Sequence, residues 1–179
     1  MNKFQIRKKI LKIRKQNDYK NLSIDFQDIY DILKKVKKVN KLVGGYYPYN
    51  YEIDGIEILK KLEKKNYKIS LPKVRNNSQM DFFGWSSKNP LQLNKYGIPE
   101  PTSNKVIYPA ILLVPLVAFD KHNNRIGYGG GFYDRYIKKI RKNKKIITIG
   151  LAYSYQEVQK VPVDKYDIKL DFIITNKKN

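Results

Sequence analysis

The chain has 179 residues, and its 37 Lys and Arg against 16 Asp and Glu give a formal net charge of +21. The absence of cysteine excludes disulfides, thiol nucleophiles and thiolate metal sites, and a single histidine, His122, rules out a histidine-rich metal centre. No apolar run reaches the roughly 18 to 20 residues of a membrane span, and no apolar segment typical of a signal peptide follows the basic N-terminus. We therefore expect a soluble cytoplasmic protein with no membrane partner.

The excess of positive charge allows two interpretations. Basic surfaces neutralise nucleic-acid phosphates, which favours an RNA-binding module. The lysines, however, are dispersed along the chain among many asparagines, isoleucines and tyrosines, as A/T-rich codons would produce. We favour this second interpretation, with an anionic small molecule as the ligand, and the charge would attract such a ligand from a distance in either case.

The hydrophobic periodicity predicts helices at 3–16, 26–39 and 55–66, and strands at 41–47 and 67–71. In the first helix Lys3 and Arg7 are four residues apart, so both project from one face. Proline ends each of the two strands, because it cannot donate to a sheet ladder. The first part of the chain is thus expected to alternate helices with strands.

The second part continues this pattern with strands at 79–85, 108–117, 145–152 and 171–175, and a helix at 132–141. Residues 86–105 contain three prolines and scattered polar residues, which predicts a long connection that serves as a lid or binding loop. Neither an internal repeat nor a linker is evident. The sequence predicts one three-layer α/β domain over residues 1–179, with a largely parallel central sheet flanked by helices.

Four glycines fall within five residues between the apolar run 111–119 and the helix predicted at 132–141: Gly127, Gly129, Gly130 and Gly131. Glycine lets backbone N–H groups approach a ligand closely and adopt positive φ. A loop of such amides that leads into a helix N-terminus can bind an anion. The spacing matches neither the Walker motif nor the dinucleotide fingerprint, so a purely structural turn is the alternative.

The residues around these glycines favour the anion-binding interpretation. Arg125 can bind phosphate oxygens with two N–H groups at once. Asp134 falls in the first turn of the predicted helix, where it can bind a hard cation such as Mg²⁺. Tyr128, Phe132 and Tyr133 offer planar faces to a ligand. The combination suggests a phosphate, a metal and a planar ligand in one pocket.

The two blocks Val-Pro-Leu-Val-Ala-Phe-Asp at 114–120 and Arg-Ile-Gly-Tyr-Gly-Gly-Gly-Phe-Tyr-Asp-Arg at 125–135 resemble the signature of the 5-formyltetrahydrofolate cyclo-ligase family, also called methenyltetrahydrofolate synthetases. The resemblance extends over essentially the whole chain. Further blocks follow in the family's order: Lys3-Phe4-Gln5-Ile6-Arg7, Tyr47-Pro48, Glu52-Ile53-Asp54, Leu71-Pro72-Lys73-Val74, Met80-Asp81-Phe82 with Trp85, Gly97-Ile98-Pro99-Glu100-Pro101, and Val161-Pro162 with Asp167.

The resemblance implies an ATP-dependent reaction on a reduced folate. ATP phosphorylates the formyl oxygen of 5-formyltetrahydrofolate, N10 attacks the activated carbon, and 5,10-methenyltetrahydrofolate, ADP and phosphate are released. Direct transfer to a substrate oxygen needs no protein nucleophile, in agreement with the absence of cysteine. It needs positioning and charge neutralisation of the γ-phosphoryl group instead.

The resemblance also implies a role for each matching residue. It implies an ATP site of Lys3, Arg7, Arg125, Ile126, Gly127, Tyr128, Gly129, Gly130, Gly131, Phe132 and Tyr133. It implies a Mg²⁺ site at Asp134 and Asp167, with a simple turn aspartate as the alternative for Asp167. It implies catalytic roles for Glu52, Tyr128 and Tyr133, and a folate-binding wall of Glu52, Met80, Phe82, Trp85, Glu100, Tyr128 and Phe132. The alternative for the apolar members of this wall is a core position.

Two positions depart from the family's pattern. Many members have tyrosine where Phe132 stands, and histidine where Tyr166 stands. Either Tyr128 or Tyr133 replaces the missing hydroxyl, or that hydroxyl is dispensable. We expect a monomer whose partner is a reduced folate, with or without a polyglutamate tail, and no nucleic-acid partner. The alternatives are the RNA-binding module and an inactive relative that binds folate or nucleotide. His122 is expected in a solvated loop.

Overall fold

The computed structural model describes residues 1–16, 22–36, 39–75 and 79–176. The helices of these residues are α1 (Lys3–Gln16), α2 (Phe26–Lys35), α3 (Gly55–Glu63), α4 (Phe132–Arg141) and the short 3₁₀ helix η1 (Ser154–Gln156). The strands are β1 (Leu42–Gly44), β2 (Lys68–Val74), β3 (Met80–Trp85), β4 (Leu91–Leu93), β5 (Pro99–Pro101), β6 (Val106–Ile107), β7 (Ile111–Pro115), β8 (Ala118–Phe119), β9 (Arg125–Ile126), β10 (Ile147–Ala152) and β11 (Phe172–Thr175).

A seven-stranded sheet in the order β11-β10-β7-β1-β2-β3-β6 forms the centre of the molecule. The first five strands of this order are parallel to one another, whereas β3 and β6 extend the sheet by antiparallel pairing. Two short ribbons, β4-β5 and β8-β9, lie outside it. The predicted α/β class with a largely parallel sheet is therefore confirmed.

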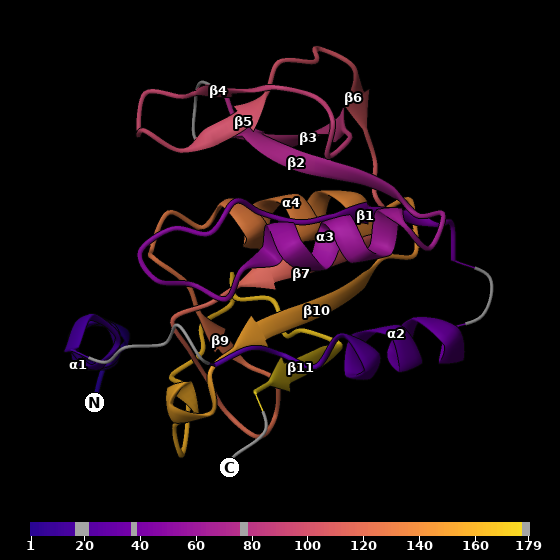
Figure 1. Cartoon of the computed structure of the whole chain (residues 1–179). Helices are drawn as coiled ribbons and strands as arrows, with labels where there is room; N and C mark the ends of the chain where they lie inside the picture. Colours follow the sequence, from indigo (N-terminus) through magenta and orange to yellow (C-terminus); the bar gives the residue numbers. More distant parts are fainter. Residues whose placement is uncertain (17–21, 37–38, 76–78, 177–179) are drawn as a thin grey trace.

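Helices cover both faces of this sheet (Figure 1). Successive side chains of strand β7 point to opposite faces of the sheet, so the strand contributes to the hydrophobic core on each face. Ile111 and Leu113 pack in the core with α2 and α3, while Leu112 and Val114 pack in the core with α4. Burial on both faces explains why this segment is an almost unbroken apolar run.

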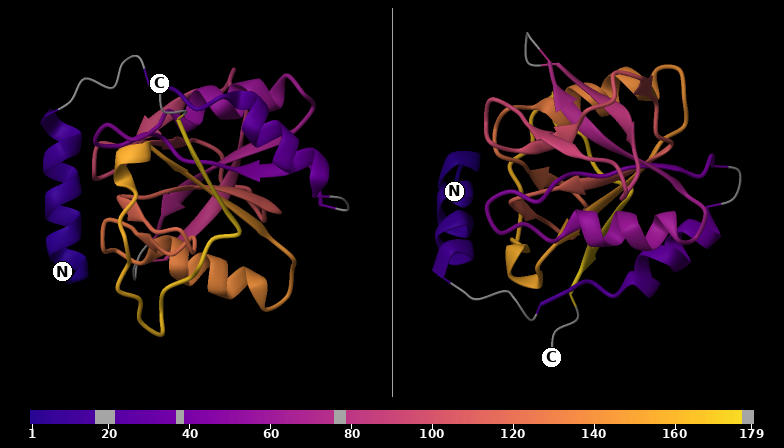
Figure 2. Two further views of the ribbon diagram at one scale, coloured as in Figure 1. Left: turned by 90° about the horizontal axis from the view of Figure 1, so that it is seen from below. Right: turned by 45° about the horizontal axis from the view of Figure 1, so that its top comes forward.

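Helix α1 lies along one side of the molecule, apart from the other helices (Figure 2). Its buried residues Ile6 and Ile10 pack against Val117, Ile126 and Val161, so this helix covers the β8-β9 ribbon and not the central sheet. Among the described helices, none combines the length and the apolar character that a membrane crossing requires.

Several element boundaries differ from the prediction. Helix α2 ends at Lys35, and residues 37–38 of the predicted helix lie outside the described part of the chain. Val36 and Val39 lie beyond the end of the helix but pack against the same core as its buried residues. The apolar pattern therefore continues past the helix, and the sequence overestimates its length. Strand β1 is shorter than predicted, and α3 ends at Glu63.

Strand β2 does not end at Pro72 but continues to Val74. The neighbouring parallel strand β1 ends at Gly44, opposite Ser70, so the missing N–H of Pro72 interrupts no ladder on that side. The predicted connection 86–105 likewise contains the β4-β5 hairpin, in which Leu91 pairs with Pro101. Strands of three residues are too short to produce a clear alternation in the sequence.

Gly44 of β1 lies in a closely packed part of the core. A Cβ atom there would lie 2.7 Å from side-chain atoms of Leu112 and Phe82, both fully buried. We expect Gly44→Ala to lower the free energy of unfolding by about 1–3 kcal/mol, because a close-packed core cannot take up the added methyl group. Urea unfolding followed by the fluorescence of Trp85 measures this change.

Gly84→Ala provides the matched control for this prediction. A Cβ atom at Gly84 would meet only Ile107, at 3.9 Å, which is ordinary van der Waals contact. The control should therefore unfold close to the wild-type midpoint. Equal stability of the two variants would contradict the close-packing argument.

Candidate active site

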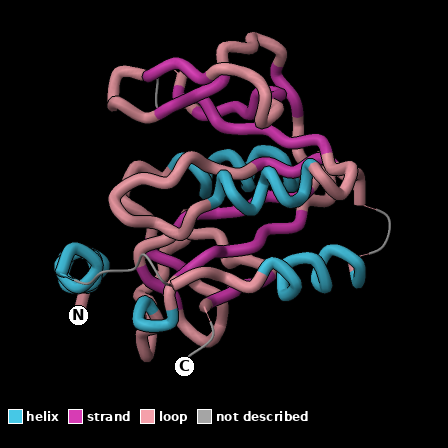
Figure 3. The backbone as a smooth tube through the Cα atoms, in the orientation of Figure 1, coloured by secondary structure: helices cyan, strands magenta, loops and turns pink. Residues whose placement is uncertain are grey.

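The loops that follow the parallel strands gather on the side of the molecule where α1 lies (Figure 3). They comprise residues 45–54 after β1, 116–131 after β7, and 157–167, which follow β10 and η1. In open parallel sheets, ligands bind at the carboxyl ends of strands. The predicted glycine loop and Glu52 both lie in this region, and so do Lys3, Arg7 and Asp167.

The glycine loop, residues 127–131, turns directly into α4. Gly129 has φ of +105° and Gly131 has φ of +64°, a conformation that favours glycine. Gly131 is the N-cap of α4, and no side chain caps this helix start. An uncapped helix N-terminus presents N–H groups that suit an anion.

Arginines fix the carbonyl groups of this loop. Arg7 Nε of α1 donates to the Gly127 carbonyl at 2.8 Å. Arg135 Nη2 of α4 donates to the Gly130 carbonyl at 2.6 Å. The N-terminal helix is therefore bonded to the glycine loop through Arg7, a residue that the family resemblance placed in the ATP site.

Lys3 joins the same helix to the loop after η1. Its ammonium group forms ion pairs with Asp164, at 2.7 Å, and with Asp167. Asp167 also accepts a hydrogen bond from the backbone N–H of Asp164. The predicted phosphate ligand Lys3 and the predicted metal ligand Asp167 are thus direct partners, and Asp164 contacts both of them.

Arg125 and Asp134 form a second, more deeply buried ion pair. The Arg125 side chain is only 5% exposed, and its Nη2 lies 2.9 Å from Oδ1 of Asp134. Asp134 also accepts a hydrogen bond from the N–H of Ile168, which brings it next to the segment of Asp167. Within the described residues, Nε of Arg125 is buried without a hydrogen-bond partner. A buried arginine with spare donors suits an anionic ligand.

Glu52 lies in a loop with unusual backbone geometry. The preceding residues Asn50 and Tyr51 have φ of 53° and 61°, which is rare for residues with a side chain. Oε2 of Glu52 accepts a hydrogen bond from the N–H of Tyr49 at 2.9 Å. Consecutive residues in this strained region often mark a functional site.

Burial raises the pKa of Glu52 from its ordinary value of 4.5 to about 7. The hydrogen bond from the Tyr49 backbone, the positive charge of Arg14 and the hydroxyl of Tyr128 oppose this shift, and burial outweighs them. A carboxyl group with a pKa near 7 can accept or release a proton at neutral pH. Glu52 is therefore suited to acid–base chemistry.

Both predicted catalytic tyrosines lie in the electrostatic environment of Glu52. Burial and then the charge of Glu52 raise the pKa of Tyr128 and that of Tyr133, so both phenols stay protonated. Tyr128 also meets the ring of Tyr49 edge-on, with ring centroids 5.9 Å apart. Among the described residues the hydroxyl of Tyr133 is buried with no hydrogen-bond partner.

The remaining predicted site residues are not gathered so closely. Phe82 has no exposed surface and packs edge-on against Tyr133, while Met80 is buried in the same core. Trp85 is buried at the opposite end of β3, where it pairs with Ile69 near the start of β2. Glu100 lies on the β4-β5 hairpin and accepts a hydrogen bond from Gln92. A folate wall that includes these residues stays a prediction.

Two further predicted residues border the glycine loop. The side chain of Ile126 is buried against α1, so only its backbone could face a nucleotide. Phe132 packs partly in the core, and the Arg135 guanidinium lies 5.4 Å from its ring centroid. His122 is exposed in a turn, as predicted.

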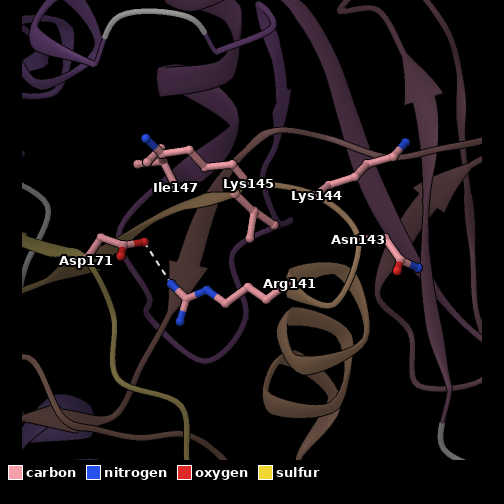
Figure 4. A pocket seen from close by; sticks show the side chains of 7 residues that line it. Arg141, Asn143, Lys144, Lys145, Ile147 and Asp171 are labelled. Carbon is pink, nitrogen blue, oxygen red and sulfur yellow. Dashed lines mark hydrogen bonds and ion pairs between the residues drawn. The ribbon is translucent and has the colours of Figure 1, made fainter.

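An open pocket lies at the amino end of β10, at the edge of the sheet away from the glycine loop (Figure 4). It is lined by Arg141, Asn143, Lys144, Lys145, Ile146, Ile147 and Asp171. Arg141 is paired with Asp171 at 2.9 Å, and the side chains of Lys144 and Lys145 extend to opposite sides. These cations do not converge on one point, so we locate the candidate site at the glycine loop.

Comparison with known proteins identifies the family of the chain. Residues 1–176 match the 5-formyltetrahydrofolate cyclo-ligase family. The chain belongs to this family. As a member of the 5-formyltetrahydrofolate cyclo-ligase family, it is a ligase.

Individual family members support the assignment. A 5-formyltetrahydrofolate cyclo-ligase of Haemophilus influenzae is 35% identical over 137 residues, which cover 73% of each chain. The corresponding protein of Escherichia coli is 30% identical over 143 residues, covering 76% of this chain and 78% of that protein.

Solved structures in the family have the same fold. A 5,10-methenyltetrahydrofolate synthetase from Mycoplasma pneumoniae superposes with a TM-score of 0.77 at 26% identity, covering 99% of this chain and 100% of that one. The synthetase from Aquifex aeolicus superposes with a TM-score of 0.78 at 29% identity, covering 99% and 91%.

The sequence reasoning missed three residues in this family member's site. Asp164 shares Lys3 with Asp167, Tyr49 binds Glu52 through its backbone, and Arg14 donates to the hydroxyl of Tyr128. For Arg14 a signal was present, because it follows Arg7 by seven residues and so lies on the same face of α1. For the other two, only the folding of the loops brings the groups together.

The raised pKa of Glu52 predicts how stability depends on pH. Below pH 4.5 the carboxyl is protonated in both the folded and unfolded chains. Between pH 4.5 and about 7 the unfolded chain releases a proton that the folded chain retains, so the free energy of unfolding falls with rising pH. We expect Glu52→Gln, which is neutral at every pH, to be more stable than wild type at pH 8 by on the order of 2 kcal/mol.

Urea titrations of both proteins at pH 4.5 and pH 8 measure this difference, which should be much smaller at the lower pH. Glu57→Gln on the exposed face of α3 is the control, because its hydrogen bond to Lys60 lowers the pKa of Glu57. The control should not gain stability at pH 8. A Glu52→Gln variant without a pH-dependent gain would refute the shifted pKa.

Proposed function

We propose that the chain converts 5-formyltetrahydrofolate to 5,10-methenyltetrahydrofolate with consumption of Mg²⁺-ATP and release of ADP and phosphate. The γ-phosphoryl group is transferred to the formyl oxygen, N10 attacks the activated carbon, and phosphate departs. The family and its named members support the overall conversion. The roles of single residues rest on the geometry described above.

The observation that carries the proposal is that one helix is bonded to both halves of the candidate site. Arg7 of α1 donates to the glycine loop, and Arg14 of the same helix donates to Tyr128 in the surroundings of Glu52. A phosphate-binding half and a proton-handling half are therefore adjacent. Phosphoryl transfer to an acceptor needs this juxtaposition, because catalysis is mostly positioning and charge neutralisation.

We assign the ATP phosphates to the glycine loop and the cations around it. The uncapped N-terminus of α4 presents N–H groups, and Lys3, Arg7 and Arg125 supply positive charge. Lys3 and Arg125 each hold a carboxylate in the structure, so phosphates would compete with Asp164, Asp167 and Asp134 for them. The net charge of +21 would increase the rate of encounter with these anions.

We assign Mg²⁺ to Asp134 and Asp167. Both are carboxylates on adjoining segments, and Mg²⁺ that is also bound by phosphate oxygens needs only one or two protein carboxylates. Mg²⁺ would neutralise negative charge on the phosphates during transfer.

We assign proton transfer at N10 to Glu52. Its pKa of about 7 leaves a substantial ionised fraction at neutral pH, so the carboxylate can accept the proton that N10 loses. Tyr128 replaces the hydroxyl absent at Phe132, because its phenol stays protonated and lies within the same hydrogen-bonded cluster. The rings of Tyr49 and Tyr128 offer flat, partly exposed surfaces to a planar ligand.

Purified protein should form the methenyl product from 5-formyltetrahydrofolate only when ATP and Mg²⁺ are both present. The near-ultraviolet absorbance of the product follows the reaction directly. Folate binding without any product would contradict the proposal and identify an inactive relative. RNA binding that weakens steeply with salt, again without product, would favour the RNA-binding module.

Asp134→Asn should lower kcat by about a hundredfold or more, since it removes a metal ligand while keeping an acceptor for Ile168. Asp31→Asn on α2 is the matched control, because Asp31 is about half exposed and its ion-pair partner is Lys34. Mg²⁺-dependent tightening of ATP binding, measured by calorimetry, should be lost in Asp134→Asn alone. Unchanged turnover in Asp134→Asn would refute the metal assignment.

A further inference from the structure

Arg14 is a cation that the described core almost completely encloses. It lies in the last turn of α1 with 1% of its surface exposed, whereas Lys12 and Lys15 on the same helix are exposed. A buried guanidinium is strongly penalised by desolvation unless its partners compensate. Its position therefore indicates a specific set of contacts.

Two hydrogen bonds fix the guanidinium group of Arg14. Nη2 donates to the carbonyl of Leu116, directly after β7, and Nη1 donates to the hydroxyl of Tyr128, both at 2.8 Å. The side-chain amide of Gln156 also donates to the Leu116 carbonyl, at 2.9 Å. One end of the Arg14 fork is thus anchored at the end of a core strand, and the other holds a side chain of the glycine loop.

We propose that Arg14 is a positioning residue for the reaction: it fixes the Tyr128 hydroxyl and holds a buried positive charge at the end of the hydrogen-bonded chain that leads through Tyr128 and Tyr49 to the Glu52 carboxyl. This inference rests on the function proposed above. It gives Arg14 a role different from that of Lys3 and Arg7, which reach the loops of the phosphate half from the first two turns of α1. One helix then serves both halves of the site.

The charges around Glu52 support this role. The N–H of Tyr49 donates to the carboxyl at 2.9 Å, and the Tyr128 hydroxyl donates to the Tyr49 carbonyl at 3.4 Å. Tyr46 of the β1 loop, Tyr128 of the glycine loop and Tyr133 of α4 interact electrostatically with the same carboxyl. Arg14 supplies the positive charge that lowers the pKa of Glu52 against the effect of burial. Without it, the carboxyl would remain protonated to higher pH and could not accept a proton at neutral pH.

The test compares Arg14→Met, which removes the charge, with Arg14→Lys, which keeps the charge and loses the two-pronged geometry. Lys15→Met, at an exposed neighbouring position, is the control. The protein is labelled with ¹³C in its glutamate carboxyls and studied by NMR. The Glu52 resonance is the one that is missing from the spectrum of the Glu52→Gln variant. Its titration reports the pKa without any substrate, so the result does not depend on whether the proposed reaction occurs.

We expect the Glu52 pKa to rise by about one unit or more in Arg14→Met and to stay near the wild-type value in Arg14→Lys and Lys15→Met. In the folate assay the pH dependence of kcat should move upward by the same amount in Arg14→Met. In Arg14→Lys, kcat should fall about tenfold or more while the KM for ATP changes little. A loss of packing alone would not move the pH profile.

An unchanged Glu52 pKa in folded Arg14→Met would overturn the electrostatic part of the inference. Wild-type kcat in Arg14→Lys would overturn the positioning part. If Arg14→Met fails to fold by circular dichroism, Tyr128→Phe takes its place, because it removes the hydroxyl through which Arg14 acts. Combining Tyr128→Phe with Arg14→Lys should then cost no more activity than the larger single change, and full additivity would refute the coupling.

Discussion

The attachment of α1 to the ribbon after β7 is the constraint on which the site depends. Ile6 and Ile10 supply the apolar contact, and Arg7 and Arg14 bond the helix to the Gly127 carbonyl and the Tyr128 hydroxyl. Because α1 lies outside the layers that cover the sheet, little else than the site region fixes its position. A helix that adds little to the central core thus supplies cations to both halves of the site.

Charge balance decides how these cations are held. Lys3 is shared by Asp164 and Asp167, and Arg125 is paired with Asp134, so the positive charges proposed for phosphate binding already have carboxylate partners. Binding of Mg²⁺-ATP would then exchange these partners: the cations would bind the phosphates, and the carboxylates would bind the metal. Such an exchange leaves few charges uncompensated at any stage, which keeps the desolvation penalty of a charged site low. Glu52 is the exception, and the structure around it accounts for a carboxyl that is easily protonated.

Much of the fold was predictable because its signals are local. The apolar run at 111–119 and the periodicities of 3–16 and 132–141 follow from burial of one stripe or of both faces, and the helices at 3–16 and 132–141 match α1 and α4. The β4-β5 hairpin and the passage of β2 through Pro72 were not predicted, because both depend on which neighbour lies beside the strand. In the site, the glycine loop with Arg125 and Asp134 could be predicted, because these residues form a continuous sequence motif. The partners of Lys3 and the burial of Arg14 were not, since their contacts join residues more than a hundred positions apart.

The sequence alone determined the fold class, the family and the residue types available for chemistry, because these follow from composition, periodicity and ordered motifs. Only the tertiary structure decided which groups the basic residues bind, and it added Arg14 to the cations that the motifs had named. It encloses Arg14, whereas other cations of the same helix stay exposed, and it raises the pKa of Glu52 to about 7 by partly burying the carboxyl. Both results depend on desolvation. Desolvation is set by the groups that surround a side chain in space, and the neighbours of a residue along the chain do not reveal those groups.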